Sequence, residues 1–165
     1  MMFEKETANI KRNAQIGLWG SVGVTILAAA FTFTPWKFYQ SAYTAKWMLI
    51  VGSVLAVLTV SMSLLVVRKQ IPRLRQSPKL ETKIIGYAQH IRSLYLSVLT
   101  IVVILCLMTV LSSQNVLLML TMITVLMLFL AYPNIYKMKV DLGLTDEEMK
   151  MLFGERYIAE TRHED

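Results

Sequence analysis

The sequence predicts an all-α integral membrane protein, a bundle of four transmembrane helices in two in–out–in hairpins with a short cytoplasmic C-terminal amphipathic helix. Three stretches carry no charged residue, 13–36, 47–67 and 93–136. No Asp or Glu lies between Glu6 and Glu81, and the 165 residues are 55% hydrophobic and 17% charged, which is more apolar than an ordinary soluble domain. A charge at the bilayer centre costs about 2.5–3.5 kcal/mol. Stretches that exclude charge therefore indicate a membrane.

The four spans follow from the length of these stretches, because a helix needs about 20 residues to cross the hydrocarbon core. The first span is predicted at about 14–34, before Pro35, and its uncharged run is longer than the apolar core of a cleaved signal peptide. The second is predicted at 47–67. The stretch 93–136 is long enough for two helices, and its only polar cluster, 112–115, predicts a turn. Spans three and four are then about 93–111 and 116–136.

The orientation follows from the Lys and Arg residues. The segments 1–13, 68–92 and 137–165 carry 15 of them, whereas the opposite side carries only Lys37 and Lys46. Basic residues accumulate in cytoplasmic loops, so both termini are predicted to be cytoplasmic, in a membrane of the bacterial inner-membrane type. Aromatic residues near the ends of the spans are interpreted as interface anchors: Trp36, Trp47, Tyr132 and Tyr136.

Small residues recur at helical spacing in the first two spans and predict helix packing faces. We expect these two stripes to contact each other. Their residues are Gly17, Ser21, Thr25, Ala28, Gly52, Ala56, Thr59 and Ser63.

The loop 68–92 is the most basic segment and is predicted to bind anionic lipid or an acidic partner. Pro72 and Pro78 predict irregular structure in its first half, and Ser77 followed by Pro78 predicts the start of a helix that continues into span three. The basic residues of the loop are Arg68, Lys69, Arg73, Arg75, Lys79, Lys83 and Arg92.

The tail 137–165 carries most of the acidic residues. Thr145 and Glu148 form a capping box that predicts a helix near 146–160. We expect this acidic helix to dock onto the basic loop 68–92; the alternative is that its apolar face binds a separate protein. The residues of that face are Met149, Leu152, Phe153 and Tyr157.

The spans lack the residues on which membrane chemistry depends. They contain no carboxylate and no histidine, and the single Cys106 is interpreted as a packing residue. His90, at the cytoplasmic end of span three, is interpreted as a solvated interfacial side chain. No catalytic, cofactor-binding or metal-binding residue is predicted.

The function expected from this pattern is that of a small non-enzymatic accessory, anchor or scaffold subunit. It would act through the basic loop and the acidic tail, with the lipid bilayer, anionic lipids, and a protein partner or a second copy as its partners, but no nucleic acid. Two alternatives stay open: an oligomeric small channel or transporter component, and a membrane enzyme working at the cytoplasmic face.

Overall fold

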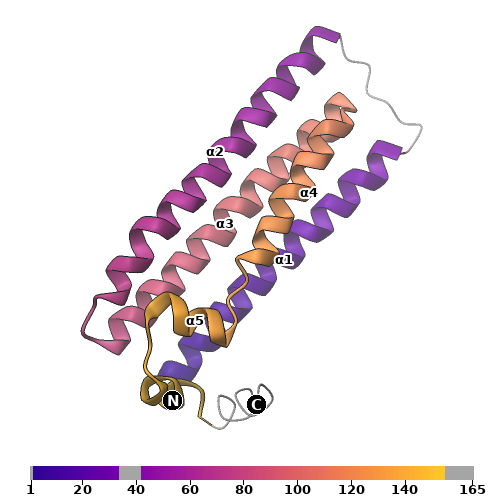
Figure 1. Ribbon diagram of the computed structural model, residues 1–165. Coiled ribbons are helices and arrows are strands. Elements are labelled where there is room, and N and C mark those ends of the chain that lie inside the picture. Colours follow the sequence, from indigo (N-terminus) through magenta and orange to yellow (C-terminus); the bar gives the residue numbers. More distant parts are fainter. Residues whose placement is uncertain (1, 34–41, 155–165) are drawn as a thin grey trace, which may run out of the picture. The chain divides into compact units, whose positions relative to one another are not determined.

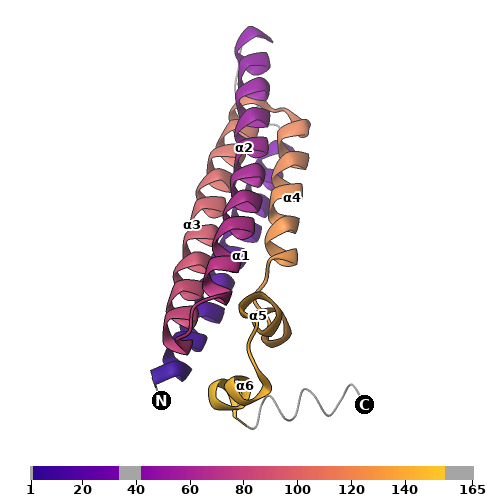
Figure 2. The same ribbon diagram turned by 60° about the vertical axis from the view of Figure 1, so that its left-hand side comes forward.

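The computed structural model describes residues 2–33 and 42–154, and every regular element in these ranges is an α-helix, which confirms the all-α class. Figure 1 shows three long helices and the shorter α4 and α5; Figure 2 adds α6. The helices are α1 (Met2–Phe33), α2 (Ala42–Arg75), α3 (Leu80–Ser112), α4 (Asn115–Leu130), α5 (Ile135–Leu142) and α6 (Asp146–Phe153).

Three helical segments are long and apolar enough to cross a membrane: Lys5–Phe33, Tyr43–Met62 and Leu80–Ser112. Helices α4 and α5 pass the same test only as a pair, and they are bent by 79° at the break between them. These findings agree with a membrane protein, and they make a fourth crossing segment dependent on the bent pair.

Helix α4 ends earlier than the span expected at 116–136. Its last turn is closed by the backbone N–H of Ala131, which donates to the carbonyl of Met127 at 3.0 Å. Pro133 follows two residues later, and a proline both lacks the N–H that a helix needs and disfavours helical backbone in the residue before it. The helix therefore stops at Leu130 instead of continuing to 136.

Helix α2 continues through Pro72 to Arg75, so the irregular structure expected in the first half of 68–92 was a wrong prediction. A proline inside a helix removes one backbone hydrogen bond, but the helix recovers directly after it, where the N–H of Gln76 donates to the carbonyl of Pro72 at 3.2 Å. Helix α3 begins at Leu80, two residues after the expected start at Pro78. The basic segment is therefore two helix ends joined by a short turn.

The chain forms two compact units. Unit 1 comprises Met1–Ala14, Leu65–Ser93 and Pro133–Asp165. Unit 2 comprises Gln15–Leu64 and Leu94–Tyr132. The long helices α1, α2 and α3 each contribute to both units. Unit 1 holds most of the charged residues and unit 2 holds the uncharged stretches.

The core of unit 2 forms where α2, α3 and α4 meet. Ala56, Leu105 and Leu117 are buried together, and other partly buried apolar side chains pack against them. Tyr95 of α3 donates its hydroxyl to the carbonyl of Leu128 on α4 at 2.9 Å, which ties these two helices at their other end.

The glycines of the two small-residue stripes, Gly17 and Gly52, lie against side chains of α3 and α4. A Cβ atom added at Gly17 would lie 2.8 Å from Cβ of Tyr95 on α3. One added at Gly52 would lie 2.6 Å from Cδ2 of Leu117 on α4 and 3.4 Å from Cδ2 of Leu105 on α3. Each glycine therefore allows a large side chain of α3 or α4 to approach the backbone, which differs from the expected contact within the first hairpin.

The tail contains a helix that the sequence analysis did not predict. Helix α5 starts where the side chain of Asn134 accepts a hydrogen bond of 2.6 Å from the N–H of Lys137, and it ends at Gly143, whose φ of 58° is left-handed. An Asn cap and a glycine after the last turn are common helix boundaries. This short helix lies in unit 1 and carries Asp141, the first acidic residue of the tail.

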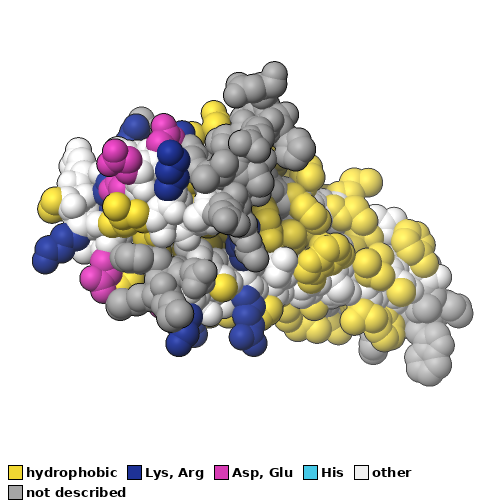
Figure 3. Space-filling model, turned by 90° about the horizontal axis from the view of Figure 1, so that it is seen from below, with side chains coloured by type: hydrophobic (Ala, Val, Ile, Leu, Met, Phe, Trp, Pro, Cys, Tyr) yellow, Lys and Arg dark blue, Asp and Glu magenta, His cyan; other side chains and the backbone are white. Residues whose placement is uncertain are grey.

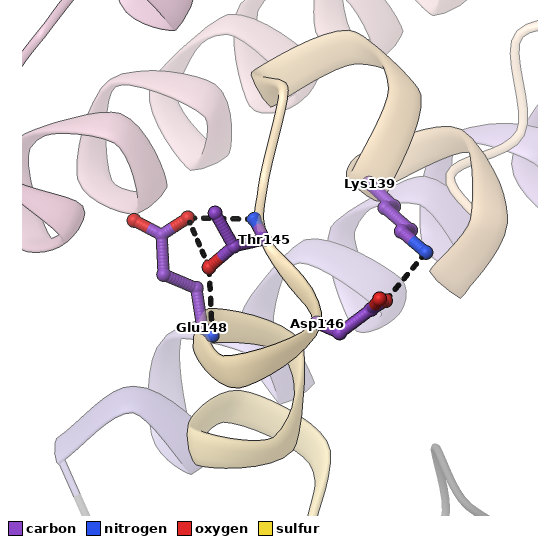
Figure 4. Close-up of polar contacts among 4 residues, drawn as sticks. All are labelled: Lys139, Thr145, Asp146 and Glu148. Carbon is purple, nitrogen blue, oxygen red and sulfur yellow. Dashed lines mark hydrogen bonds and ion pairs between the residues drawn. The ribbon is translucent and has the colours of Figure 1, made fainter.

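Helix α6 starts with the capping box that the sequence predicts (Figure 4). Glu148 donates its N–H to Oγ1 of Thr145 at 3.2 Å, and the N–H of Thr145 donates to Oε2 of Glu148 at 2.8 Å. The helix ends at Phe153, before Gly154 with a φ of 53°, so it is shorter than the expected 146–160. Residues 155–160 lie outside the described residues.

Candidate functional site

The tail packs onto the basic segment inside unit 1, as the sequence analysis expected. Lys83 of α3 forms an ion pair with Glu148 of α6, with 3.8 Å between Nζ and Oε1. Tyr87, one turn farther along α3, donates its hydroxyl to Oδ2 of Asp141 on α5 at 3.1 Å. The two acidic side chains come from different helices of the tail, so both α5 and α6 are docked.

Opposite charge alone does not explain this docking. The ion pair is long, at 3.8 Å, and the cost of removing the largely buried Lys83 ammonium from water offsets much of its attraction to Glu148. A larger contribution comes from apolar burial at about 25 cal/mol per Å². The buried apolar residues that α3, α5, α6 and the segments beside them supply to unit 1 are Ile84, Tyr87, Ile91, Ile135, Met138, Leu142, Leu144, Met149 and Leu152.

The face of the tail helix that could have met a separate protein is largely used inside the chain. Met149 and Leu152 are buried, and Phe153 is half-buried. The fourth residue of that face, Tyr157, lies outside the described residues. The side chains of Met149 and Leu152 therefore pack inside unit 1, and the alternative of a separate partner on this face stays a prediction.

His90 is buried, which corrects its interpretation as a solvated interfacial residue. It is 4% exposed, and its Nδ1 lies 2.9 Å from Oε1 of Gln70 on α2. An amide oxygen only accepts, so the pair requires the proton on Nδ1. Burial lowers the pKa of His90 from its ordinary value, and the negative charge of Asp141 opposes this shift. His90 lies before Arg92 and the uncharged stretch of α3. Its partner Gln70 lies on α2 before Pro72.

The basic residues of 68–92 differ in how exposed their side chains are. Lys83 is buried against the tail, and the side chain of Arg68 lies outside what the structure describes. Arg75 is exposed but lies along Gly143, where an added Cβ atom would be 2.5 Å from its Nε. The exposed members are Lys69, Arg73, Arg75, Lys79 and Arg92.

The surface reflects this difference. On the face that Figure 3 shows, charged side chains gather over one part of the molecule and hydrophobic side chains cover another part. Lys139 of α5 and Asp146 of α6 form an ion pair, with 2.7 Å between Nζ and Oδ1 (Figure 4). Of the expected interface anchors, Trp47 and Tyr136 are exposed and Tyr132 is half-buried. Trp36 lies outside the described residues.

The buried Ser and Thr hydroxyls described in unit 2 donate within their own helices. Ser21 and Thr25 are buried and donate to the carbonyls four residues earlier, each at 2.7 Å. Thr109, Thr121 and Thr124 do the same at 2.8 Å. Each of these hydroxyl donors is therefore satisfied within its own helix, as is common for Ser and Thr inside helices.

The remaining predicted packing residues are buried or half-buried where the structure describes them. Gly17, Ala28, Gly52 and Ala56 are buried, and half-buried Thr59 donates to the carbonyl of Leu55 at 2.7 Å. The side chain of Ser63 lies outside what the structure describes. Cys106 is buried among these helices.

A polar groove lies in unit 1 between α1 and α3, and the sequence analysis did not identify it. Its polar residues on α1 recur at helical spacing, which is the signal that could have found them. The residues that line it are Glu6, Asn9, Asn13, Ile85, Ala88, Gln89 and Arg92. Within the described ranges, no group of three or more His, Cys, Asp or Glu side chains could hold a metal ion.

The sequence matches no known protein-family model, and neither the sequence nor the fold has a match among curated proteins or solved structures. A functional conclusion therefore depends on the surfaces of the two units.

Proposed function

We propose that this protein is a non-enzymatic membrane scaffold, an accessory or anchor subunit that presents a basic surface at the cytoplasmic face of a bacterial inner membrane. Unit 2 would be embedded through its parts of α1, α2 and α3 and through the shorter α4, with both termini and unit 1 in the cytoplasm. The observation that carries the proposal is the docked tail. It engages Asp141 and Glu148 and buries its own apolar face, while five basic side chains of 68–92 stay exposed.

The exposed apolar side chains of unit 2 support the membrane location. A soluble monomer rarely exposes a contiguous apolar patch of more than a few hundred Å², because water contact with such a surface is unfavourable. Lipid removes that penalty. Large exposed apolar residues of unit 2 are Trp19, Ile26, Leu27, Phe31, Ile50, Val54, Leu58, Leu107, Met119, Ile123, Leu126 and Phe129.

The exposed basic side chains support a partner of negative charge. Each Lys or Arg near an anionic membrane surface contributes about 1 kcal/mol of attraction, and the same side chains suit an acidic protein surface. Lys83 does not take part, because its ammonium is already paired with Glu148. The proposed surface therefore comprises Lys69, Arg73, Arg75, Lys79 and Arg92.

Co-purification after gentle solubilisation tests the scaffold function. We expect a protein recovered at a fixed ratio with the wild type to be lost from a variant carrying Lys69→Gln, Arg73→Gln and Lys79→Gln. The matched control is Lys150→Gln, an exposed lysine of α6 outside this surface. Topology reporters at Asp165 and within 38–45 show whether the variants keep the cytoplasmic orientation. Recovery of no protein at a fixed ratio, or equal recovery with all variants, contradicts the proposal.

A second candidate is an oligomeric channel or transporter component, favoured by the exposure of α2. The segment Tyr43–Met62 is the least buried of the three long apolar segments, so it offers a face to further copies. Ion or solute flux in liposomes containing only this protein would support this candidate. A cytoplasmic-face enzyme has no comparable support, because His90 is buried against Gln70.

A further inference from the structure

We propose that the groove between α1 and α3 in unit 1 binds the phosphoethanolamine headgroup of a membrane lipid. The proposal rests on the membrane placement in the proposed function, and it adds a specific lipid class and a site. The groove has a volume of about 470 Å³ and is open to the surface, as a site for a headgroup on a lipid that stays in the bilayer must be.

Two helical stripes form the groove. Glu6, Asn9 and Asn13 are spaced by three and four residues, so they share one face of α1. Ile85, Ala88, Gln89 and Arg92 share one face of α3 in the same way, and half-buried Ile85 and Ala88 are its apolar members. The site therefore combines a small apolar surface with polar groups on both sides.

The polar groups suit a zwitterion. Arg92 supplies guanidinium donors for a phosphate, and the three amides of Asn9, Asn13 and Gln89 both donate and accept. Glu6 is the acidic residue among the described side chains of the lining and suits an ammonium group. Within the described part of the chain, no ion pair involves either Glu6 or Arg92. A ligand carrying both charges would satisfy both residues.

The order of these groups along the helices matches the order in a lipid. Helices α1 and α3 run in the same direction, because Gly17 lies against Tyr95 and Gly20 lies against Leu99. Arg92 directly precedes the uncharged stretch of α3. On α1, Glu6 lies seven residues before Asn13, so Glu6 is about 10 Å farther than Asn13 from the uncharged stretch of that helix.

In phosphatidylethanolamine the phosphate adjoins the acyl-bearing glycerol and the ammonium lies at the outer end. The phosphate would therefore meet Arg92 and the ammonium would meet Glu6. Phosphatidylglycerol has a phosphate but no amine, so it would leave the carboxylate of Glu6 unmatched. Selectivity between these two lipids is consequently the property that distinguishes the proposed site from general attraction by basic side chains.

Native mass spectrometry of the full chain in detergent, titrated with phosphatidylethanolamine or phosphatidylglycerol, tests the site. We expect the wild type to retain phosphatidylethanolamine preferentially. Arg92→Gln should weaken binding of both lipids about tenfold, since charge-assisted hydrogen bonds to a phosphate are lost. Glu6→Gln should weaken only phosphatidylethanolamine and abolish the preference. The matched controls are Lys150→Gln and Glu81→Gln, exposed residues outside the groove, and they should leave the preference unchanged.

Soluble glycerophosphoethanolamine identifies the source of the headgroup. Failure of this compound to displace the lipid at equal concentration supports a lipid site, whereas full displacement contradicts it. Equal retention of the two lipids by wild type, Glu6→Gln and Arg92→Gln overturns the groove proposal. Topology reporters and partner recovery are read separately in the same variants. If topology and partner recovery are as the proposed function expects but the wild type shows no preference between the two lipids, only the groove proposal is contradicted. The scaffold function is then unaffected.

Discussion

The hydroxyl of Tyr87 on α3 donates a hydrogen bond of 3.1 Å to Oδ2 of Asp141 on α5, 54 residues farther along the chain. Tyr87 is fully buried, so its polar group must be satisfied inside the protein. The acceptor comes from the tail, and the contact joins the basic segment to its acidic counterpart. The closed state of unit 1 can therefore be tested at this residue.

Tyr87→Phe should loosen the docked tail. The substitution keeps the ring and removes the hydroxyl, so Asp141 loses a hydrogen bond, and unit 1 should lose about 1–2 kcal/mol of stability. The measurement is the rate of protease cleavage within 68–79 in detergent, which should rise. Tyr136→Phe is the control, because Tyr136 is 69% exposed and should cleave at the wild-type rate. Equal rates for all three proteins would show that the bond contributes nothing.

The Lys83–Glu148 ion pair predicts an asymmetric effect of neutralisation. The side chain of Lys83 is 10% exposed, so Glu148→Gln leaves a largely buried ammonium without its counter-charge and should destabilise unit 1 by about 1–3 kcal/mol. Lys83→Met should be nearly neutral, because an apolar side chain of similar length replaces the desolvated charge.

Thermal unfolding in detergent micelles compares the two ion-pair variants. Glutamine still serves in a capping box, so the helix start is preserved in Glu148→Gln, and Glu147→Gln on the exposed side of α6 is the control. A larger loss from Lys83→Met than from Glu148→Gln would refute this account of the pair.

His90 makes the stability of unit 1 sensitive to acid. Burial lowers the pKa of His90 in the folded protein, so the unfolded chain, with a pKa near 6.5, binds the proton more tightly. Stability is therefore fully present above pH 6.5 and falls as the pH drops below that value. Asp141 reduces the effect, because its charge favours the protonated ring.

Unfolding free energies between pH 8 and pH 5.5 measure this dependence. His90→Gln removes the titrating group and should flatten the pH profile in that range. Tyr136→Phe, at a residue that is 69% exposed, is the control and should keep the wild-type slope. An unchanged slope in His90→Gln would assign the acid sensitivity to other groups.

Gly17 and Gly23 predict opposite outcomes for the same substitution within one helix. Gly17→Ala would place a methyl group 2.8 Å from both Cβ and Cδ1 of Tyr95, and overpacking of this kind costs about 1–3 kcal/mol. At Gly23 nothing lies within 4 Å of an added Cβ atom, so Gly23→Ala should be neutral or stabilising by up to about 1 kcal/mol. Unfolding of the two variants in the same micelles checks the difference, and equal stability would contradict the close α1–α3 contact.

Local patterns identified much of the helical structure. Uncharged stretches indicate long helices because charge is excluded from lipid, and the Thr145 and Glu148 box places the start of α6 at the residue where it occurs. The attraction of the acidic tail to the basic segment was also predictable, because the two carry opposite charge. The groove could not be predicted, because Glu6 and Arg92 are 86 residues apart in the sequence. Only the packing of α1 on α3 brings the two helix faces together.

The sequence by itself therefore determined the helical class, the apolar segments and the opposite charges of the loop and the tail, since each depends on residue type and local spacing. Only the tertiary structure decided what those residues face. It continues α2 through Pro72 and covers His90, it pairs Gly17 with Tyr95, and it buries Met149. The physical reason is that a side chain's partner depends on contacts between distant segments. Spacing along one helix defines a face, but it does not identify the helix that packs against it.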